Sequence, residues 1–365
     1  MNRLLLLTLD FPPRQGGVAR YLNGLATHFQ DRMTVVATPE AGSAMFDETV
    51  PYALERVELL YQAVWPRWLK TIRELLVRRR SYEMVLVSHV IPLGTAAWIA
   101  CMCTGRPYAV IVHGLDLARA VRSSWKRWLT SRVLENARLV VANSEALLAE
   151  VRQSFRIAQG VVVYPSVARP VNPQPSRKGM GEGPVCLLTV ARLVEHKGHL
   201  RVLAALALLR ENGLLEGLRY RIVGDGPMAQ TIEKVLHSLR LDAYVVLDRH
   251  LDDAALAEAY RGADIFVMPT EQGREDREGF GTVYLEAAAY GVPSIASDVP
   301  GVREAVLGEE MGLLVPDGDI SALAQAIARL AGDPDLRDRL GAAAYRRVAA
   351  EFTPDRQFSK LVPFL

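Results

Sequence analysis

Cysteine is scarce in this sequence. The 365 residues include three cysteines, and Cys101 and Cys103 stand two apart in an apolar stretch. No histidine or second cysteine pair lies at the spacing of a zinc site. A disulfide framework is therefore excluded, and we interpret the cysteines as reduced core residues of a cytoplasmic protein.

Long apolar runs are also missing. A helix that spans a bilayer needs about 20 consecutive apolar residues, whereas Leu4–Leu7 is short and Ile91–Cys103 is interrupted by Pro92 and Gly94. The first leucines superficially resemble a secretion signal, but Asp10 ends the run and no small-residue cleavage site follows. We therefore expect no membrane span, and a first buried strand near the amino terminus.

A Gly-x-Gly-x-x-Gly fingerprint is absent as well, which disfavours a nicotinamide dehydrogenase. Hydrophobic residues make up 50% of the chain and charged residues 23%, which is typical of soluble globular proteins. Disordered and collagen-like architectures are therefore excluded.

Short apolar runs alternate with longer amphipathic segments along the whole chain. We predict strands at Leu4–Leu9, Met33–Ala37, Met84–Ser88, Tyr108–Val112, Leu139–Ala142, Val185–Val190, Tyr220–Val223, Tyr244–Leu247, Ile265–Met268, Pro293–Ala296 and Gly312–Val315. Strands separated by helices indicate parallel sheets with right-handed crossovers. The pattern predicts an α/β fold with two Rossmann-like domains facing a cleft.

A stretch rich in proline and glycine, residues 165–183, separates the two halves and is typical of an interdomain connector. We predict one domain over residues 1–168 and a second over residues 180–352. Ligands of open α/β sheets bind outside the carboxyl ends of the strands, so charged and glycine-rich segments at those ends are the first candidates for function.

The two halves differ in charge. Residues 1–165 hold 20 Lys and Arg against 13 Asp and Glu, whereas residues 166–365 hold 23 against 28. The positive charge gathers with tryptophans in two predicted helices, at 65–80 and 119–138. One interpretation is an anionic membrane surface; the other is solvated helix faces with the tryptophans packed inward. No nucleic-acid module is present, and no nucleic-acid partner is expected.

Gly16 and Gly17 follow the first predicted strand and precede a helix that begins near Val18. Backbone N–H groups at such a helix start can approach an anion. Glycines before a helix also serve as a plain tight turn, so both interpretations stay open here.

Arg192 and Lys197 lie five residues apart, at the turn that follows the first strand of the second half. Both cations can converge there on one phosphate group. The alternative is a pair of solvated loop cations.

The segment from Glu278 to Glu286 is the strongest local feature. Glycines open a helix near Gly281, Glu278 precedes that start, and Glu286 lies inside the helix. A carboxylate in an apolar helix start needs hydrogen-bond partners, and sugar hydroxyls would supply them. Two exposed glutamates are the alternative.

Several motifs, taken in order, resemble those of one enzyme family. They are Phe11-Pro12-Pro13 with Gly16-Gly17, His113-Gly114-Leu115-Asp116, Asn143-Ser144, Arg192 with Lys197-Gly198, Gly224-Asp225-Gly226-Pro227, the Glu278 and Glu286 pair, Ser297-Asp298 with Gly301 and Glu304, and Gly312 to Asp319. Their order and spacing resemble the retaining glycosyltransferases of family 4, which have the two-domain GT-B fold. The resemblance covers nearly the whole chain and implies that residues 353–365 pack back on the first domain.

The resemblance implies a sugar-nucleotide donor bound by the second domain. The donor residues would be Arg192 and Lys197 at the diphosphate, Glu286 at the ribose, His250 near the nucleobase, and Glu278 with the backbone of Gly279, Phe280, Gly281 and Thr282 at the transferred sugar and its phosphate. Gly16 and Gly17 would approach the diphosphate from the first domain. His113 would lie over the donor sugar, and Asp10 and Asp116 are candidates to accept a hydrogen bond from the acceptor hydroxyl.

The family pattern implies retaining, metal-independent transfer of a hexosyl group to a lipid-linked or saccharide acceptor, with no cofactor and no Asp-x-Asp metal site. The motifs look most like those of GDP-mannose-dependent mannosyltransferases that act on phosphatidylinositol mannosides, on the cytoplasmic face of the membrane. The alternatives are a UDP-sugar-dependent glycosyltransferase, a sugar-nucleotide epimerase of the same fold, and a non-catalytic two-domain binding protein.

Overall fold

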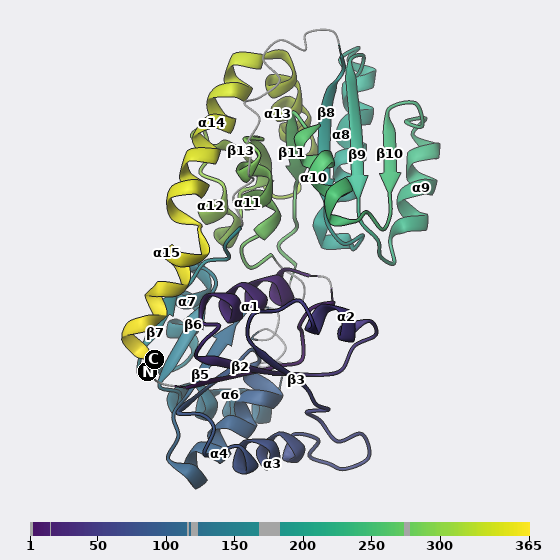
Figure 1. Ribbon diagram of the computed structural model, residues 1–365. Helices are drawn as coiled ribbons and strands as arrows, with labels where there is room; N and C mark the ends of the chain where they lie inside the picture. Colours follow the sequence, from purple (N-terminus) through teal and green to yellow (C-terminus); the bar gives the residue numbers. More distant parts are fainter. Residues whose placement is uncertain (1–2, 15, 115–116, 118–122, 168–182, 274–277) are drawn as a thin grey trace. The chain divides into compact units, whose positions relative to one another are not determined.

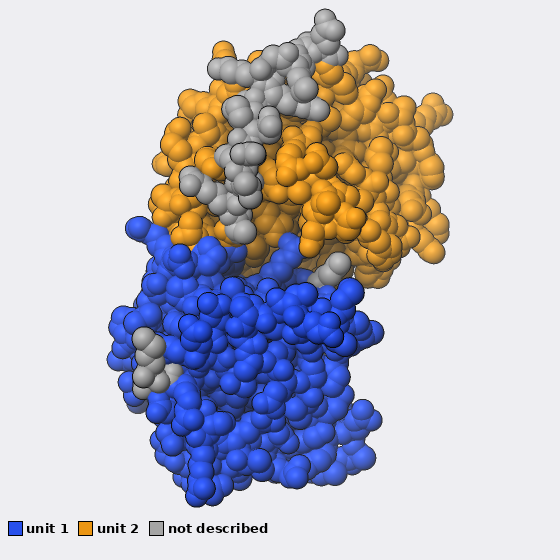
Figure 2. All heavy atoms as spheres, in the orientation of Figure 1, with its two compact units in different colours: residues 1–166, 354–365 blue, residues 167–353 orange. Residues whose placement is uncertain are grey.

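The computed structural model describes residues 3–365 except 15, 115–116, 118–122, 168–182 and 274–277. The chain divides into two compact units (Figure 2). Unit 1 comprises Met1–Ser166 with Pro354–Leu365, and unit 2 comprises Val167–Thr353. Most of the proline- and glycine-rich connector lies outside the described residues.

Unit 1 is built on a parallel sheet of seven strands in the order β3-β2-β1-β4-β5-β6-β7 (Figure 1). The strands are β1 (Leu4–Thr8), β2 (Met33–Ala37), β3 (Ala53–Arg56), β4 (Met84–Val87), β5 (Tyr108–Val112), β6 (Leu139–Ala142) and β7 (Gly160–Val162). Its helices include α1 (Gly17–His28), α2 (Ser43–Asp47), α3 (Leu69–Val77), α4 (Thr95–Thr104), α6 (Ser124–Glu135), α7 (Glu145–Ser154) and α15 (Pro354–Phe358).

The continuous apolar run of β1 is explained by helices on both faces of this sheet. Leu5 and Leu7 pack in one core cluster with residues of α3, α4, α6 and α7, whereas Leu4 and Leu6 pack in another with residues of α1. Phe358 belongs to this second cluster, so the end of the chain packs on α1 in unit 1. A strand buried on both faces has no polar side, which is typical of parallel sheets.

Unit 2 contains a parallel sheet of six strands in the order β10-β9-β8-β11-β12-β13. The strands are β8 (Val185–Val190), β9 (Leu218–Val223), β10 (Val245–Asp248), β11 (Ile265–Met268), β12 (Ser294–Ser297) and β13 (Gly312–Val315). Its helices include α8 (His199–Glu211), α9 (Ala229–Ser238), α10 (Asp253–Arg261), α11 (Thr282–Ala289), α12 (Pro300–Ala305), α13 (Ile320–Gly332) and α14 (Pro334–Glu351). The predicted α/β architecture with two Rossmann-like domains is confirmed.

Three sequence expectations need correction. Strands β3 and β7, at the two edges of the unit 1 sheet, were not predicted: β3 has no continuous apolar run, and β7 has only three residues. Cys103 is exposed at the end of α4, so the cysteines are not all core residues. The basic helices are shorter than 65–80 and 119–138: α3 covers Leu69–Val77, and α6 begins at Ser124.

Candidate functional site

Two neighbouring strands of unit 2 carry the central donor-site candidates. Strands β8 and β11 lie side by side, yet the chain leaves β8 toward β9 and β10 and leaves β11 toward β12 and β13. Such a reversal of strand order opens a crevice at the carboxyl ends of the two strands. Arg192 and Lys197 follow β8, and Glu278 follows β11, so all three belong to loops at this point.

The two loops are tied together by the backbone. The carbonyl of His196 accepts hydrogen bonds from the Thr270 hydroxyl at 2.8 Å and from the backbone N–H of Glu271 at 2.7 Å. A Cβ on Gly198 would lie 2.1 Å from the carbonyl oxygen of Pro269. Glycine at 198 therefore permits the loop after β8 to sit against the loop after β11.

Lys197 and Glu278 form an ion pair between these loops, with side chains only 15% and 14% exposed. Burial pushes the pKa of Glu278 upward, but the neighbouring Lys197 ammonium outweighs this and holds the pKa below its ordinary value of 4.5. Arg192 is exposed and also lowers the pKa of Glu278 electrostatically. The structure thus brings Arg192, Lys197 and Glu278 together.

The backbone between Glu278 and α11 is held by close packing against α12 and Phe352. A Cβ on Gly301, in α12, would lie 2.1 Å from the carbonyl oxygen of Gly279. Phe280 is 1% exposed and packs against Phe352, with ring centroids 5.9 Å apart. The Phe280 side chain therefore anchors this loop in the core of unit 2.

Gly281 directly precedes α11, and Thr282 is its first residue, so the predicted helix start is confirmed. Four residues after Thr282, Glu286 accepts a hydrogen bond from the Tyr260 hydroxyl at 2.8 Å. The Tyr260 ring stacks on Tyr290 with centroids 5.4 Å apart. This stack holds the half-buried Glu286 carboxylate in one orientation.

His250 does not join this cluster. Its ring is 77% exposed after β10 and lies 3.4 Å from the carboxylate of Asp225. Arg249 also contacts Asp225, and its hydrogen bond lowers the pKa of that carboxyl. His250 occupies the carboxyl edge of the same sheet, two strands from β8.

His199 was missed in the sequence analysis. The first residue of α8, it is 2% exposed, and its Nε2 lies 3.2 Å from the Arg192 carbonyl oxygen. Burial lowers the pKa of His199 to about 4. The ring is therefore neutral at pH 7, and Nε2 donates to the backbone of Arg192. Its only sequence signal was a histidine directly after the Lys197-Gly198 turn.

The first-domain candidates lie in unit 1. His113 follows β5, and its ring packs against the Tyr21 ring in a T-shaped arrangement with centroids 5.6 Å apart. Gly16 and Gly17 form the start of α1 and are exposed. Asp116 lies outside the described residues.

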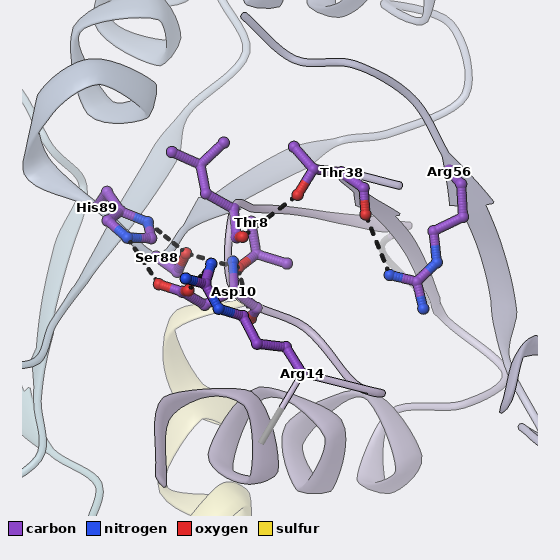
Figure 3. A network of polar contacts seen from close by, with 8 residues as sticks. Thr8, Asp10, Arg14, Thr38, Arg56, Ser88 and His89 are labelled. Atoms are coloured by element: carbon purple, nitrogen blue, oxygen red, sulfur yellow. Dashed lines mark hydrogen bonds and ion pairs between the residues drawn. The ribbon is translucent and has the colours of Figure 1, made fainter. Parts of the chain in front are cut away.

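Unit 1 also contains a polar network, of which the sequence analysis named only Asp10 (Figure 3). Asp10 lies 2.7 Å from Arg14 and 3.2 Å from Nε2 of His89. His89 Nδ1 lies 2.9 Å from the Ser88 hydroxyl, which in turn donates to Thr8. A lone Ser-His pair after a strand carries little signal in the sequence, which is why His89 was missed.

Among the described residues, no three His, Cys, Asp or Glu side chains lie close enough together to hold a metal ion. Asp-x-Asp does occur twice, at 317–319 and 333–335, contrary to expectation. Within these motifs, Asp319 and Asp333 cap α13 and α14, and Asp317 pairs with Arg201. Each of these three carboxylates thus has a structural partner.

Three of the four tryptophans of the basic segments are exposed rather than packed inward, and Trp68 is half-buried. Trp65 is 85% exposed, Trp125 is 59% and Trp128 is 58%. Helix α4 contacts α3 and α6, so these segments share one face of the unit 1 sheet (Figure 1). In the part of the chain that the structure describes, no helix combines the length and hydropathy of a membrane span.

Two family models match the chain. The model described as Glycosyltransferase Family 4 matches residues 15–168, and the model described as Glycosyl transferases group 1 matches residues 172–347. Together they cover both units.

Two curated relatives match along nearly their whole length. The chain is 30% identical to the GDP-mannose-dependent alpha-(1-6)-phosphatidylinositol monomannoside mannosyltransferase of Mycobacterium tuberculosis, over 100% of this chain and 98% of the relative. It is 28% identical to the protein of the same name from Mycolicibacterium smegmatis, over 93% and 92%.

A solved structure of Anabaena Alr3699/HepE in complex with UDP and glucose superimposes with a TM-score of 0.82 at 18% identity, over 100% of this chain and 99% of that one. At this identity the likeness concerns the fold.

The family matches favour a glycosyltransferase over an epimerase, a dehydrogenase or a non-catalytic binding protein. The chain therefore belongs to the family 4, group 1 glycosyltransferases and has their two-domain GT-B fold.

Proposed function

We propose that this glycosyltransferase transfers a mannosyl group from GDP-mannose to a phosphatidylinositol mannoside-type lipid, with retention of configuration and without a metal ion. The observation that carries the proposal is the cluster of Arg192, Lys197 and Glu278 at the strand reversal of unit 2. The full-length similarity to two GDP-mannose-dependent mannosyltransferases supports the donor and the acceptor class.

The cations fit the chemistry of the leaving group. When the bond between the sugar C1 and the phosphate oxygen breaks, negative charge grows on the β-phosphate of the nucleoside diphosphate. Arg192 and Lys197 are fixed charges that stabilise it, because their loop is held by His199 and by the loop after β11. Two protein cations at this position fit the role that Mg²⁺ has in metal-dependent transfer.

Glu278 has a separate task. Its carboxylate is ionised and oriented by Lys197, so it is suited to accept hydrogen bonds from hydroxyls of the transferred sugar. Glu286, oriented by Tyr260, is the corresponding acceptor for the ribose hydroxyls. The two carboxylates thus address the sugar and the nucleoside of one donor.

The exposed tryptophans of unit 1 support a lipid acceptor reached from an anionic membrane surface. Lys126 lies 5.7 Å from the Trp125 ring centroid, and Arg132 lies 5.9 Å from that of Trp128. Interfacial helices combine such tryptophans with cations, each of which contributes about 1 kcal/mol near anionic lipid. The proposal therefore includes peripheral binding to the cytoplasmic face of the membrane.

Donor choice is tested first by thermal shift with GDP, UDP and ADP, with and without EDTA. We expect a GDP-selective stabilisation that survives EDTA, followed by mannosyl transfer from GDP-mannose to phosphatidylinositol monomannoside. A shift with UDP alone would replace the mannosyl donor by a UDP-sugar. NMR of the product reports the anomeric configuration, and a β-linked product would contradict retention.

Membrane binding is tested by sedimentation with vesicles. We expect the protein to sediment with vesicles that contain phosphatidylinositol. With neutral phosphatidylcholine vesicles, we expect it to stay in the supernatant. The double variant Trp125→Ser with Trp128→Ser should lose most binding, whereas Leu214→Ser removes an exposed apolar side chain of unit 2 and serves as the control. Equal binding by both variants would refute the surface.

A further inference from the structure

The Asp10 and His89 network lies at the strand reversal of unit 1. Strands β1 and β4 are neighbours, but the chain leaves β1 toward β2 and β3 and leaves β4 toward β5, β6 and β7. Asp10 follows β1, and His89 follows β4 (Figure 3). The network therefore occupies in unit 1 the position that the donor residues occupy in unit 2, which is where open α/β sheets bind ligands.

The hydrogen bonds of this network have a fixed direction. The Thr8 hydroxyl donates its one hydrogen to the carbonyl of Asp10 at 2.9 Å. The Ser88 hydroxyl must then donate to Thr8, also at 2.9 Å. Ser88 also lies 2.9 Å from Nδ1 of His89, which ties the imidazole ring to the ends of β1 and β4.

The second ring nitrogen of His89 faces an acceptor as well. Nε2 lies 3.2 Å from Oδ2 of Asp10. The pKa of Asp10 is lowered, chiefly by the hydrogen bond from His89, so this carboxyl is ionised at neutral pH and accepts only. Both ring nitrogens of His89 therefore face oxygen atoms, and Nε2 links the ring to the Asp10 carboxylate.

Asp10 keeps acceptor capacity toward solvent. Its side chain is 30% exposed, and Arg14, 2.7 Å from Oδ1, is 54% exposed. A carboxylate has about four lone-pair positions, of which His89 and Arg14 take one each. His113 also acts electrostatically on Asp10 and lowers its pKa. The result is an oriented carboxylate acceptor beside the Arg14 guanidinium, an arrangement that can bind adjacent hydroxyls of a sugar or cyclitol ring.

We propose that Asp10 binds ring hydroxyls of the acceptor, and that His89 is a positioning residue that holds the Asp10 carboxylate in place. This inference rests on the proposed transfer function and adds the acceptor subsite to it. Thr8 and Ser88, both fully buried, connect the pair to the ends of β1 and β4. Asp10 is thereby anchored to the two central strands of the unit 1 sheet.

The test measures transfer at saturating GDP-mannose while phosphatidylinositol monomannoside is varied in detergent micelles. The variants are Asp10→Asn, His89→Ala and His89→Gln. The control, Asp355→Asn, removes the carboxylate of another Asp–His pair of unit 1, in which Asp355 lies 3.2 Å from His28. GDP affinity and melting temperature are measured for every variant.

We expect Asp10→Asn to raise the acceptor KM at least about tenfold, the effect of losing a charge-assisted hydrogen bond, with kcat changed less. GDP affinity should stay at the wild-type value. His89→Ala should raise the acceptor KM similarly, and His89→Gln should recover much of the loss because its amide can donate to Asp10. Asp355→Asn should behave as wild type.

The failures are distinguishable. If wild-type protein transfers mannose but Asp10→Asn keeps its acceptor KM, the acceptor subsite is refuted while the proposed function stands. If His89→Gln is as impaired as His89→Ala, the positioning role of His89 is refuted. If the wild-type protein transfers to no lipid or saccharide acceptor, the proposed function is refuted, and this subsite with it.

Discussion

Lys197 and Glu278, 81 residues apart in sequence, form an ion pair between the loops that follow β8 and β11. Each residue alone would be a largely buried charge, and breaking such a pair is strongly destabilising. In the proposed donor site, a phosphate that binds Lys197 would approach a cation already oriented by Glu278.

Lys197→Ala should weaken GDP binding. One charge-assisted contact to phosphate is worth about 1.5–3 kcal/mol, or roughly 10- to 150-fold in affinity. Isothermal titration with GDP measures this, with Lys234→Ala, an exposed lysine of α9, as the matched control. Unchanged affinity in Lys197→Ala would remove Lys197 from the diphosphate site.

Glu278→Gln should keep GDP binding and lose most mannosyl transfer, by about 100-fold or more, since an oriented charge that acts on the transferred sugar is lost. The glutamine is nearly isosteric and its amide oxygen can still accept a hydrogen bond from Lys197, which limits the cost of losing the ion pair, and the melting temperature is measured alongside. Rates with GDP-mannose and affinities for GDP are compared in the same preparation. Normal turnover would assign the sugar-binding role to another residue.

Glu286→Ala should weaken GDP binding but leave binding of inorganic pyrophosphate unchanged, because Glu286 is assigned to the ribose. Loss of a hydrogen bond to a charged acceptor predicts about a tenfold effect or more. Competition of both ligands against a fluorescent GDP analogue separates the two contributions. An equal loss for pyrophosphate would indicate that the variant disturbs the whole site.

His199 makes unit 2 sensitive to acid. The pKa of His199 is about 4 in the folded chain, against an ordinary 6.5. The unfolded chain therefore takes up the proton first as pH falls. The contribution of neutral His199 to the free energy of unfolding is therefore complete above pH 6.5. It is lost as the pH falls from 6.5 to about 4. The shift corresponds to at most about 3 kcal/mol.

His199→Gln retains a donor to the Arg192 carbonyl and does not titrate. We expect its melting temperature to fall less than that of the wild type between pH 6.5 and pH 4. Thermal melts at five pH values measure the difference, in which the carboxylates common to both proteins cancel. Parallel curves would exclude His199 as the source.

Gly301→Ala should destabilise unit 2 by about 1–3 kcal/mol and reduce transfer, because the added methyl would meet the Gly279 carbonyl oxygen at 2.1 Å. Gly332→Ala is the control, since its Cβ would have no neighbour within 4 Å. Denaturant unfolding followed by far-ultraviolet circular dichroism measures both, because all five tryptophans lie in unit 1. Equal stability of the two variants would show that the loop at Gly279 adjusts at little cost.

Local patterns were sufficient for most of the elements with a continuous apolar run. The run at β1 predicted a buried parallel strand, and the glycines before Thr282 predicted the start of α11; both are confirmed. Edge strands such as β3 were missed because half of their side chains face solvent, which gives no continuous run. The exposure of Trp125 was also undecided, since helical spacing does not show which side faces the core.

The sequence by itself determined the fold class, the glycosyltransferase family and the loops that carry the charged residues, because these depend on periodicity and on motif order along the chain. The tertiary structure decided which charges meet. Lys197 pairs with Glu278, and His89 with Asp10, because parallel strands that are distant in sequence end side by side at a strand reversal. The order of strands in the sheet sets which distant residues pair, and no local sequence pattern predicts that order.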